Sequence, residues 1–270
     1  MRRFVFIVLS LLTIVASTSA QPHQNQARAE RLLFIGNSLT YVGNLPAAFA
    51  TLANANGKKV EVDFLVRGGA TLNDRLVDGL ASASLKQGNY KYVILQERGG
   101  ELLGAFGPEA RCRAIEAINQ YSELATLYRT KLFYLGTYQP KAEVSRRMIA
   151  EDRQALQNKS VEYIEISETL GELRSVHPEY MWFSLDNTLH PGADLVLLEA
   201  VKIYWQIYAQ LPEELPLQVI APIYSAKQSP NFVLQSVTKP ESVAGIPGRV
   251  DYSREKLSAI VRHLKERPAH

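Results

Sequence analysis

The sequence has little cysteine and histidine, and this scarcity limits the chemistry that the chain can carry. Cys112 is the only cysteine among 270 residues, so no internal disulfide can form. It stands between two arginines at an expected helix start, and we expect it to be a structural thiol. The five histidines do not combine with it at the spacing of metal ligands. The sequence therefore predicts neither a metal site nor a cofactor.

The chain also lacks a strong excess of charge of either sign. Its 30 basic and 27 acidic residues leave a formal charge of +3, and no basic stripe interleaved with aromatic residues is present. This balance gives no electrostatic reason to expect a nucleic-acid partner. The hydrophobic fraction of 46% and the charged fraction of 21% are ordinary for a globular domain with one sizeable core.

The apolar run at the N-terminus is short for a membrane span, which needs about 20 residues. Arginines at positions 2 and 3 precede the apolar stretch from Phe4 to Ala16, and small residues follow it up to Ala20. This pattern predicts a secretory signal peptide over residues 1–20, with a retained membrane anchor as the alternative. Its removal lowers the formal charge to +1 and predicts a periplasmic or secreted protein without stable membrane insertion.

Strand-like runs alternate with helical stretches along most of the chain. The strands are expected at Arg31–Ile35, Val60–Val66, Tyr92–Leu95, Leu132–Leu135 and Val161–Ile166, and the helices at about 45–56, 72–84, 109–129, 141–158 and 193–210. Alternating elements with short connections predict a parallel sheet covered by helices on both faces. The expected fold is therefore a three-layer α/β/α sandwich of flavodoxin-like type.

A serine and a histidine occupy positions suited to nucleophilic catalysis. Ser38 follows the first expected strand, at the start of a helix expected near residues 45–54, and His190 precedes the helix that Pro191 opens. A serine hydroxyl needs an imidazole to take its proton, and the imidazole needs a partner that fixes its tautomer. Each residue alone is more often structural, as a helix cap or a loop residue. Their order and context together favour a serine nucleophile at the carboxyl end of the sheet.

The run Gly36-Asn37-Ser38-Leu39 resembles the first sequence block of the SGNH hydrolases, also called GDSL esterases and lipases, with asparagine in place of the aspartate. The run Gly68-Gly69-Ala70-Thr71-Leu72 resembles the second block, although a glycine pair after a strand is also a common turn. The resemblance covers roughly residues 32–210. It implies that Ser38 is the nucleophile, that His190 relays the proton, and that the backbone N–H groups of Ser38 and Gly69 hold the oxyanion.

The third block departs from the family pattern. After the strand Tyr92–Leu95 the chain reads Gln96-Glu97, where the family usually has Gly-x-Asn-Asp, and this is similar to branches of the superfamily with a Gln-Glu step. A glutamine amide can donate to an oxyanion as asparagine does. We therefore expect Gln96 in the oxyanion hole, with the alternative that it only satisfies nearby loop carbonyls.

The last block departs as well. The family spacing is Asp-x-x-His, but Asp186 stands four residues before His190 and Asn187 stands three before it. Either a longer loop brings Asp186 to the ring or Asn187 replaces the acid. A carboxylate stabilises the imidazolium that forms during attack, so the physics favours Asp186.

The segment between residues 171 and 189 is expected to be a loop rich in aromatic residues. Tyr180, Trp182 and Phe183 either pack the edge of the sheet or line an acyl or sugar pocket beside His190. His177 is a minor alternative for the base, although no acid stands before it at the spacing of the family's last block and no helix start follows it.

Together these features predict an exported serine esterase or deacylase that uses Ser38, His190 and Asp186. Its expected substrate is a small-molecule or carbohydrate ester, such as an O-acetyl group on a carbohydrate or a cell-envelope component. An acyltransferase or lipase on the same site, or a degenerate ligand-binding module, are the alternatives. We expect residues 21–30 to be a linker, 31–210 the catalytic domain, and the proline-rich segment 211–270 an extension that packs on it and ends in an amphipathic helix.

Overall fold

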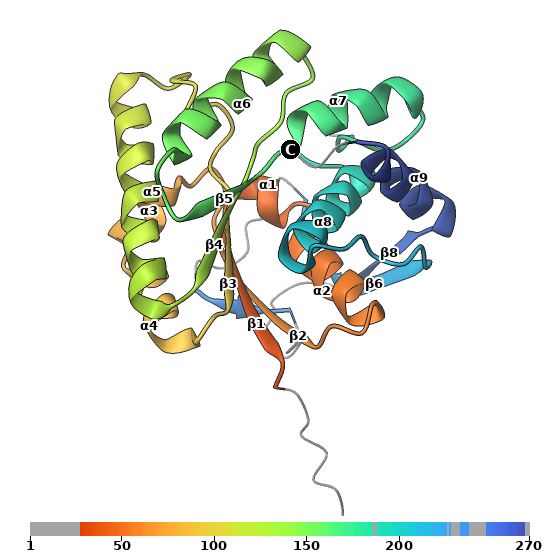
Figure 1. The fold of residues 1–270 in the computed structure, drawn as a ribbon, viewed down its shortest axis with the longest axis horizontal. Coiled ribbons are helices and arrows are strands. Elements are labelled where there is room, and N and C mark those ends of the chain that lie inside the picture. The colour runs from red at the N-terminus through yellow and green to blue at the C-terminus, as the bar shows by residue number, and fades with distance from the viewer. Residues whose placement is uncertain (1–27, 186–187, 226, 228–232, 238–246, 268–270) are drawn as a thin grey trace, which may run out of the picture.

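A mainly parallel sheet forms the centre of the protein (Figure 1). The computed structural model describes residues 28–185, 188–225, 227, 233–237 and 247–267, so the expected signal peptide and most of the expected linker lie outside the described residues. The strand order is β5-β4-β3-β1-β2-β7, and only β7 is antiparallel to its neighbour. The strands are β1 (Glu30–Gly36), β2 (Val60–Val66), β3 (Tyr92–Leu95), β4 (Lys131–Leu135), β5 (Val161–Ile164) and β7 (Gln235–Ser236).

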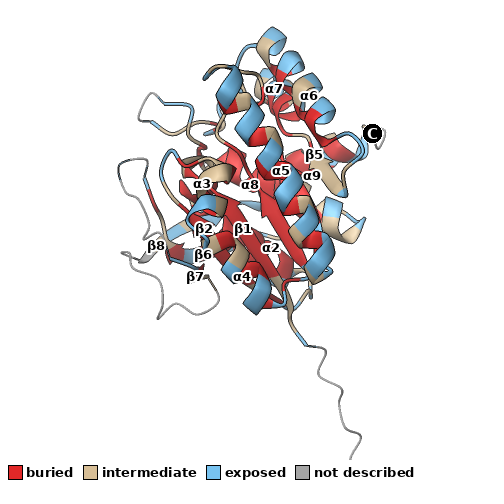
Figure 2. Cartoon of the chain, turned by 90° about the vertical axis from the view of Figure 1, so that its left-hand side faces the viewer, coloured by how far each residue is buried: buried red, intermediate tan, exposed pale blue. Residues whose placement is uncertain are grey.

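Helices cover both faces of this sheet (Figures 1 and 2). One face carries α3 (Leu72–Val77), α4 (Leu80–Gly88), α5 (Pro108–Tyr128) and α6 (Ala142–Leu156), and the other carries α2 (Leu45–Ala55), α7 (Ser167–Val176), α8 (Ala193–Tyr208) and α9 (Arg254–Lys265). Alternate residues of β1 serve the two cores: Leu33 and Ile35 pack toward α5, whereas Leu32 and Phe34 pack toward α2 and α8. The predicted three-layer α/β/α fold is confirmed.

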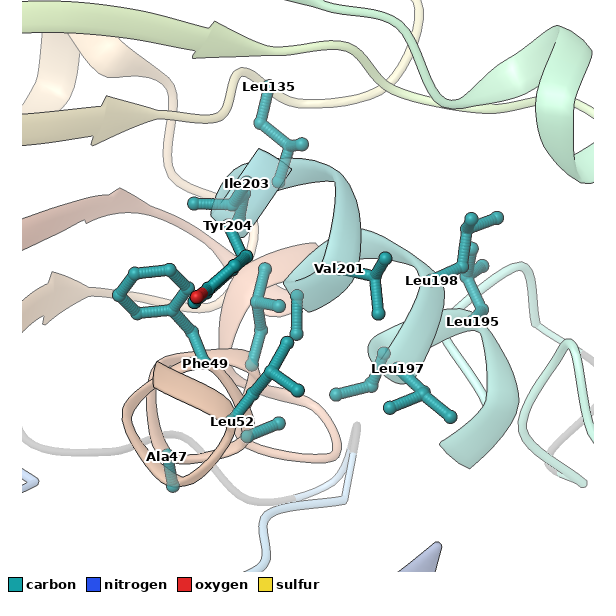
Figure 3. Close-up of a cluster of buried hydrophobic side chains, with 14 of the residues drawn as sticks. Ala47, Phe49, Leu52, Leu135, Leu195, Leu197, Leu198, Val201, Ile203 and Tyr204 are labelled. Atoms are coloured by element: carbon teal, nitrogen blue, oxygen red, sulfur yellow. The ribbon is translucent and has the colours of Figure 1, made fainter. Parts of the chain in front are cut away.

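Helices α2 and α8 pack against each other through buried hydrophobic side chains (Figure 3). Phe49 and Leu52 of α2 are fully buried together with Val201 and Tyr204 of α8. Burial of side chains of this size stabilises the fold by roughly 1.5–3 kcal/mol each. Because α8 begins three residues after His190, this core anchors the C-terminal end of the loop that carries the histidine.

Several elements differ from the prediction for identifiable reasons. The helix expected at 72–84 is two helices, because Gly79 adopts a left-handed conformation (φ 74°) between α3 and α4. The strand expected to reach Ile166 ends at Ile164, since Glu165 turns to accept hydrogen bonds from the first turn of α7, which the sequence had not indicated. Cys112, which we expected to be a structural thiol, is exposed on α5 and so has no role in the core.

The C-terminal part of the chain adds a second, two-stranded antiparallel sheet and a helix. β6 (Leu217–Pro222) pairs with β8 (Pro247–Tyr252) and contacts α2, while α9 contacts α8. The amphipathic face predicted for α9 is buried, as the near-zero exposure of its apolar residues shows, and these residues are Leu257, Ile260, Val261 and Leu264. Among the described helices, none combines the length and the apolar character that crossing a membrane requires.

Candidate active site

The strand order creates a switch point at β1. The chain leaves β1 to form β2 on one side and later returns to form β3 on the other, with Gly36 paired to Val66 and Ile35 paired to Leu95. In open α/β sheets a crevice for ligands forms outside the carboxyl ends of the strands at such a point. The loops after β1, β2 and β3 carry Ser38, Gly69 and Gln96, so the structure brings these three segments to one edge of the sheet.

Ser38 begins a separate short helix, α1 (Ser38–Tyr41), instead of the helix at 45–54 that we expected. Asn37 caps α1 by accepting a hydrogen bond from the Leu39 N–H at 3.0 Å, and Ser38 itself is half-buried. Gly36 is required before it, since a Cβ there would lie 2.2 Å from Thr40 Oγ1. The chain can therefore turn this tightly at the end of β1 only with glycine at this position.

His190 lies on a loop whose two ends are joined by backbone hydrogen bonds. Ser184 N–H donates to the His190 carbonyl and Gly192 N–H donates to the Trp182 carbonyl, each at 3.0 Å. A Cβ at Gly192 would lie 2.2 Å from the Met181 carbonyl oxygen, so only glycine allows the two segments to approach this closely. Asp186 and Asn187 lie outside the described residues, so their order of importance stays a prediction.

The Nδ1 atom of the His190 ring is hydrogen-bonded to the Thr188 hydroxyl. Thr188 was not predicted as a site residue, because the family pattern in this block concerns only the acid and the histidine. A hydroxyl at Nδ1 occupies the position from which a triad acid orients the ring. Thr188 is therefore a further residue that can fix the tautomer of His190.

The loop that carries His190 approaches the serine segment through neighbouring residues. A Cβ at Gly43, in the turn after α1, would lie 2.8 Å from Val196 Cγ2 in the first part of α8. The rings of Tyr138, which follows β4, and Phe183 of the histidine loop are 6.0 Å apart. The turn after the serine helix and the start of α8 thus lie close together, and the histidine loop packs beside the residue that follows β4.

Gly69 lies in the exposed turn between β2 and α3 and has a φ of 67°. Only glycine adopts this left-handed conformation without strain, which explains the residue type. Thr71 then caps α3 in a capping box with Asp74. Its neighbour Leu72 directs its backbone N–H to both carboxyl oxygens of Glu97 at 3.2 Å.

The side chain of Gln96 does not point to an open site. It is buried, its Nε2 donates to Glu199 Oε1 at 3.2 Å, and its Oε1 accepts from the Thr40 hydroxyl at 2.7 Å. The side-chain amide therefore contacts neither an open oxyanion site nor the loop carbonyls of the alternative, and pairs with a buried carboxyl group and a buried hydroxyl. The physical reason is that Glu199 on α8 offers an acceptor beneath α1, a partner 103 residues away in sequence.

Glu97 is a second buried group whose role the sequence analysis missed. Its carboxyl group also accepts a hydrogen bond from Arg98 N–H at 2.8 Å, and burial raises its pKa to about 8. Because it accepts the Leu72 N–H as well, Glu97 ties the loop after β3 to the start of α3. The Gln-Glu step therefore links the segments that carry Ser38 and Gly69.

The aromatic residues of the histidine loop differ in exposure. Trp182 is buried and its Nε1 donates to the His177 carbonyl at 2.8 Å, so it packs the core and does not line an open pocket. Phe183 is half-buried against Tyr138. Tyr180 is half-buried and stacks on His177 with ring centroids 4.5 Å apart. Tyr180 and Phe183 keep enough exposure to contact a substrate.

The Nδ1 atom of His177 lies 3.3 Å from Glu179 Oε1, and its ring stacks on Tyr180. Among the described residues, no group of three or more His, Cys, Asp or Glu side chains is arranged to hold a metal ion.

No protein-family profile matches the sequence, and no curated protein matches it at a significant level. Solved structures with a similar fold include a candidate SGNH hydrolase from Slackia heliotrinireducens, with 20% identity, a TM-score of 0.53, and coverage of 67% of this chain and 100% of that one. A DUF4886 family protein from Bacteroides uniformis has 12% identity, a TM-score of 0.53, and coverage of 68% and 84%. The acetyl xylan esterase AlAXEase has 14% identity, a TM-score of 0.52, and coverage of 66% and 99%. At these identities the likeness shows that the chain has the SGNH hydrolase fold, while the Gln-Glu branch stays a prediction.

Proposed function

We propose that the protein is an exported serine ester hydrolase of SGNH type. The observation that carries the proposal is the placement of Ser38 at the switch point of the sheet, with the helix after His190 packed against the turn that follows α1. This arrangement supports acyl transfer through a serine, because the segments that would supply nucleophile and base approach each other at Gly43 and Val196. The acetyl xylan esterase with the same fold favours an acyl group on a carbohydrate as the substrate.

In the proposed reaction, Ser38 Oγ attacks the acyl carbonyl carbon while His190 accepts the hydroxyl proton. The backbone N–H groups of Ser38 and Gly69 stabilise the oxyanion of the tetrahedral intermediate. The C–O bond to the alcohol then breaks, and His190 gives the proton to the leaving oxygen. Water attacks the acyl-enzyme with His190 again as the base, which releases the acid and restores Ser38.

The loop that carries His190 must hold the imidazole ring in the orientation that the reaction needs. In the tautomer with its proton on Nδ1, the ring donates to the Thr188 hydroxyl and the Nε2 lone pair is the one that takes the serine proton. Asp186 is proposed to stabilise the imidazolium through its charge. A carboxylate supplies a charge that a hydroxyl does not, so the two groups have complementary roles.

The proposal is tested with a fluorophosphonate probe on the wild type and on Ser38→Ala. We expect a covalent adduct on Ser38 in the wild type, no adduct in the variant, and loss of ester hydrolysis without loss of fold. Near-wild-type turnover of the variant would refute the serine mechanism. Absence of any adduct or turnover in the wild type would favour a ligand-binding module.

Two rival activities on the same site are separated by substrate. Rates on model esters of increasing acyl length distinguish a lipase, which prefers long chains, from a deacylase. Product analysis with a sugar acceptor present distinguishes transfer from hydrolysis. Mass spectrometry of the mature N-terminus from the periplasm or medium tests export and cleavage after Ala20.

A further inference from the structure

Gln96 contacts the serine helix at two points on either side of the nucleophile. Its side-chain Oε1 accepts from the Thr40 hydroxyl at 2.7 Å, and its backbone carbonyl accepts from Asn37 Nδ2 at 3.3 Å. Asn37 precedes Ser38 and Thr40 follows it by two residues. All three contacting residues are buried, so water does not compete for these hydrogen bonds.

The helix that carries Ser38 needs such external support. α1 has only four residues, and helices shorter than about 12 residues are marginal in water because nucleation is costly. Its orientation must come from the groups packed beneath it. Thr40 also packs closely against Gly36, where an added Cβ would lie 2.2 Å from the Thr40 Oγ1 atom.

Glu199 anchors the other end of this hydrogen-bond chain. It lies within α8, is fully buried, and accepts the Gln96 Nε2–H at 3.2 Å. Burial raises its pKa to about 8, so the carboxyl group is mostly neutral at pH 7. A buried carboxyl costs free energy that an apolar residue would not, which makes a purely space-filling role a poor explanation.

Two further polar atoms lie near Glu199, at this end of the hydrogen-bond chain. Among the described residues, Glu199 Oε2 and the Tyr138 hydroxyl are both buried without a hydrogen-bond partner. Burial and then the nearby Glu199 raise the pKa of Tyr138 well above its usual value. Among the described contacts of Glu199, the hydrogen bond from Gln96 Nε2 is therefore the one that orients its carboxyl group.

We propose that Glu199, Gln96 and Thr40 form a buried positioning chain that holds α1 in the orientation presenting Ser38. This inference rests on the proposed function, since it concerns how the same nucleophile is aimed. It replaces the direct oxyanion role of Gln96 by an indirect one. Gln96, Thr40 and Glu199 are thus positioning residues, and the oxyanion is left to backbone N–H groups.

Thr40→Val and Glu199→Leu test the proposal, because each breaks the chain at one end without touching Ser38. We expect each to lower kcat by about 10- to 100-fold, with KM changed less than about twofold, since misplacement by about 1 Å costs up to about 100-fold. Thr40→Ser and Glu199→Gln keep a donor and an acceptor, and each should recover most of the lost kcat. Amide hydrogen exchange of residues 39–42 should become at least about fivefold faster in Thr40→Val.

Thr130→Val is the matched control. Its buried hydroxyl donates to the Tyr90 carbonyl at 2.8 Å, at the amino end of β4 and away from the site, so kcat and the exchange of residues 39–42 should stay at the wild-type level. If Gln96 instead acts directly on the oxyanion, Thr40→Val and Glu199→Leu will keep wild-type kcat while Gln96→Ala loses it, and the proposal is overturned. A wild type that is not labelled at Ser38 overturns the proposed function itself, and unchanged exchange in Thr40→Val then overturns the positioning chain separately.

Discussion

Lys256 should stabilise the histidine loop from the C-terminal helix, and Lys256→Met tests this. Its Nζ donates to Asp194 Oδ2 at 2.8 Å, and the same oxygen accepts the Met181 N–H at 2.7 Å. Asp194 N–H in turn donates to the Met181 carbonyl at 3.1 Å. Asp194 therefore joins α9, the start of α8 and the segment that enters the histidine loop.

The expected loss of unfolding free energy follows from how far each side chain of the Lys256–Asp194 pair is buried. The Asp194 side chain is 1% exposed and that of Lys256 is 36% exposed. A hydrogen bond to a charged group contributes about 1.5–3 kcal/mol, and partial exposure of the lysine reduces this to about 1–2 kcal/mol. The carboxylate keeps its Met181 contact and the favourable N-terminus of α8, so the loss is not larger. For a domain of this size the melting temperature should fall by about 2–8 °C.

Lys265→Met on the same helix is the control. Lys265 pairs with Glu214 at 3.2 Å, but both side chains are exposed, at 58% and 38%, so about 0.5 kcal/mol or less is expected. Thermal and denaturant unfolding of the two variants and the wild type gives the comparison. The Lys256 effect should persist at high salt because Asp194 is buried. Equal melting temperatures for the two variants would refute the reasoning.

In the histidine loop, Asp186→Ala should lower kcat severely and Asn187→Ala far less, because only a carboxylate stabilises the imidazolium. If steady-state kinetics give the reverse ranking, Asn187 occupies the place of the acid. Glu199→Gln should change how stability depends on pH. The carboxyl pKa is raised from 4.5 to about 8 in the folded state, so the wild type binds one more proton folded than unfolded in that window. Its unfolding free energy therefore falls relative to the variant as pH rises from about 5 to 8, by up to about 1.4 kcal/mol per pH unit, and parallel denaturant curves across pH would contradict this. Activity should survive exhaustive chelation, whereas loss that a divalent ion restores would contradict the serine mechanism.

The layered fold was predictable because its signals are local. The periodicity of apolar residues marks β1 to β4 and α5 within a residue or two. The break at Gly79 was missed, since a glycine inside a helical pattern does not announce a left-handed conformation. α7 was missed because Leu170 and Leu173 are its only fully buried apolar residues and its first turn is capped by a glutamate before it.

Only the site residues that belong to recognisable sequence motifs could be predicted. Ser38 and Gly69 could be placed after their strands, because a glycine must precede or form each turn. The direction of the Gln96 side chain could not be foreseen, because it depends on Glu199, which comes close only when α8 packs on α2. Thr188 was overlooked for a different reason: a hydroxyl beside a histidine has no distinctive sequence pattern.

The two lateral edges of the sheet meet their surroundings differently, which bears on self-association at high concentration. β7 pairs with β2 and shields that edge through two residues. The opposite edge is β5, where Glu162 forms a salt bridge with Lys131 at 2.7 Å and accepts a hydrogen bond from Gln206 at 2.9 Å. An edge strand offers backbone groups to a strand of another molecule, and a charged side chain there makes that pairing unfavourable. One edge of the sheet thus ends in a strand of two residues, and the other carries a charged pair, two features that disfavour strand addition from another molecule.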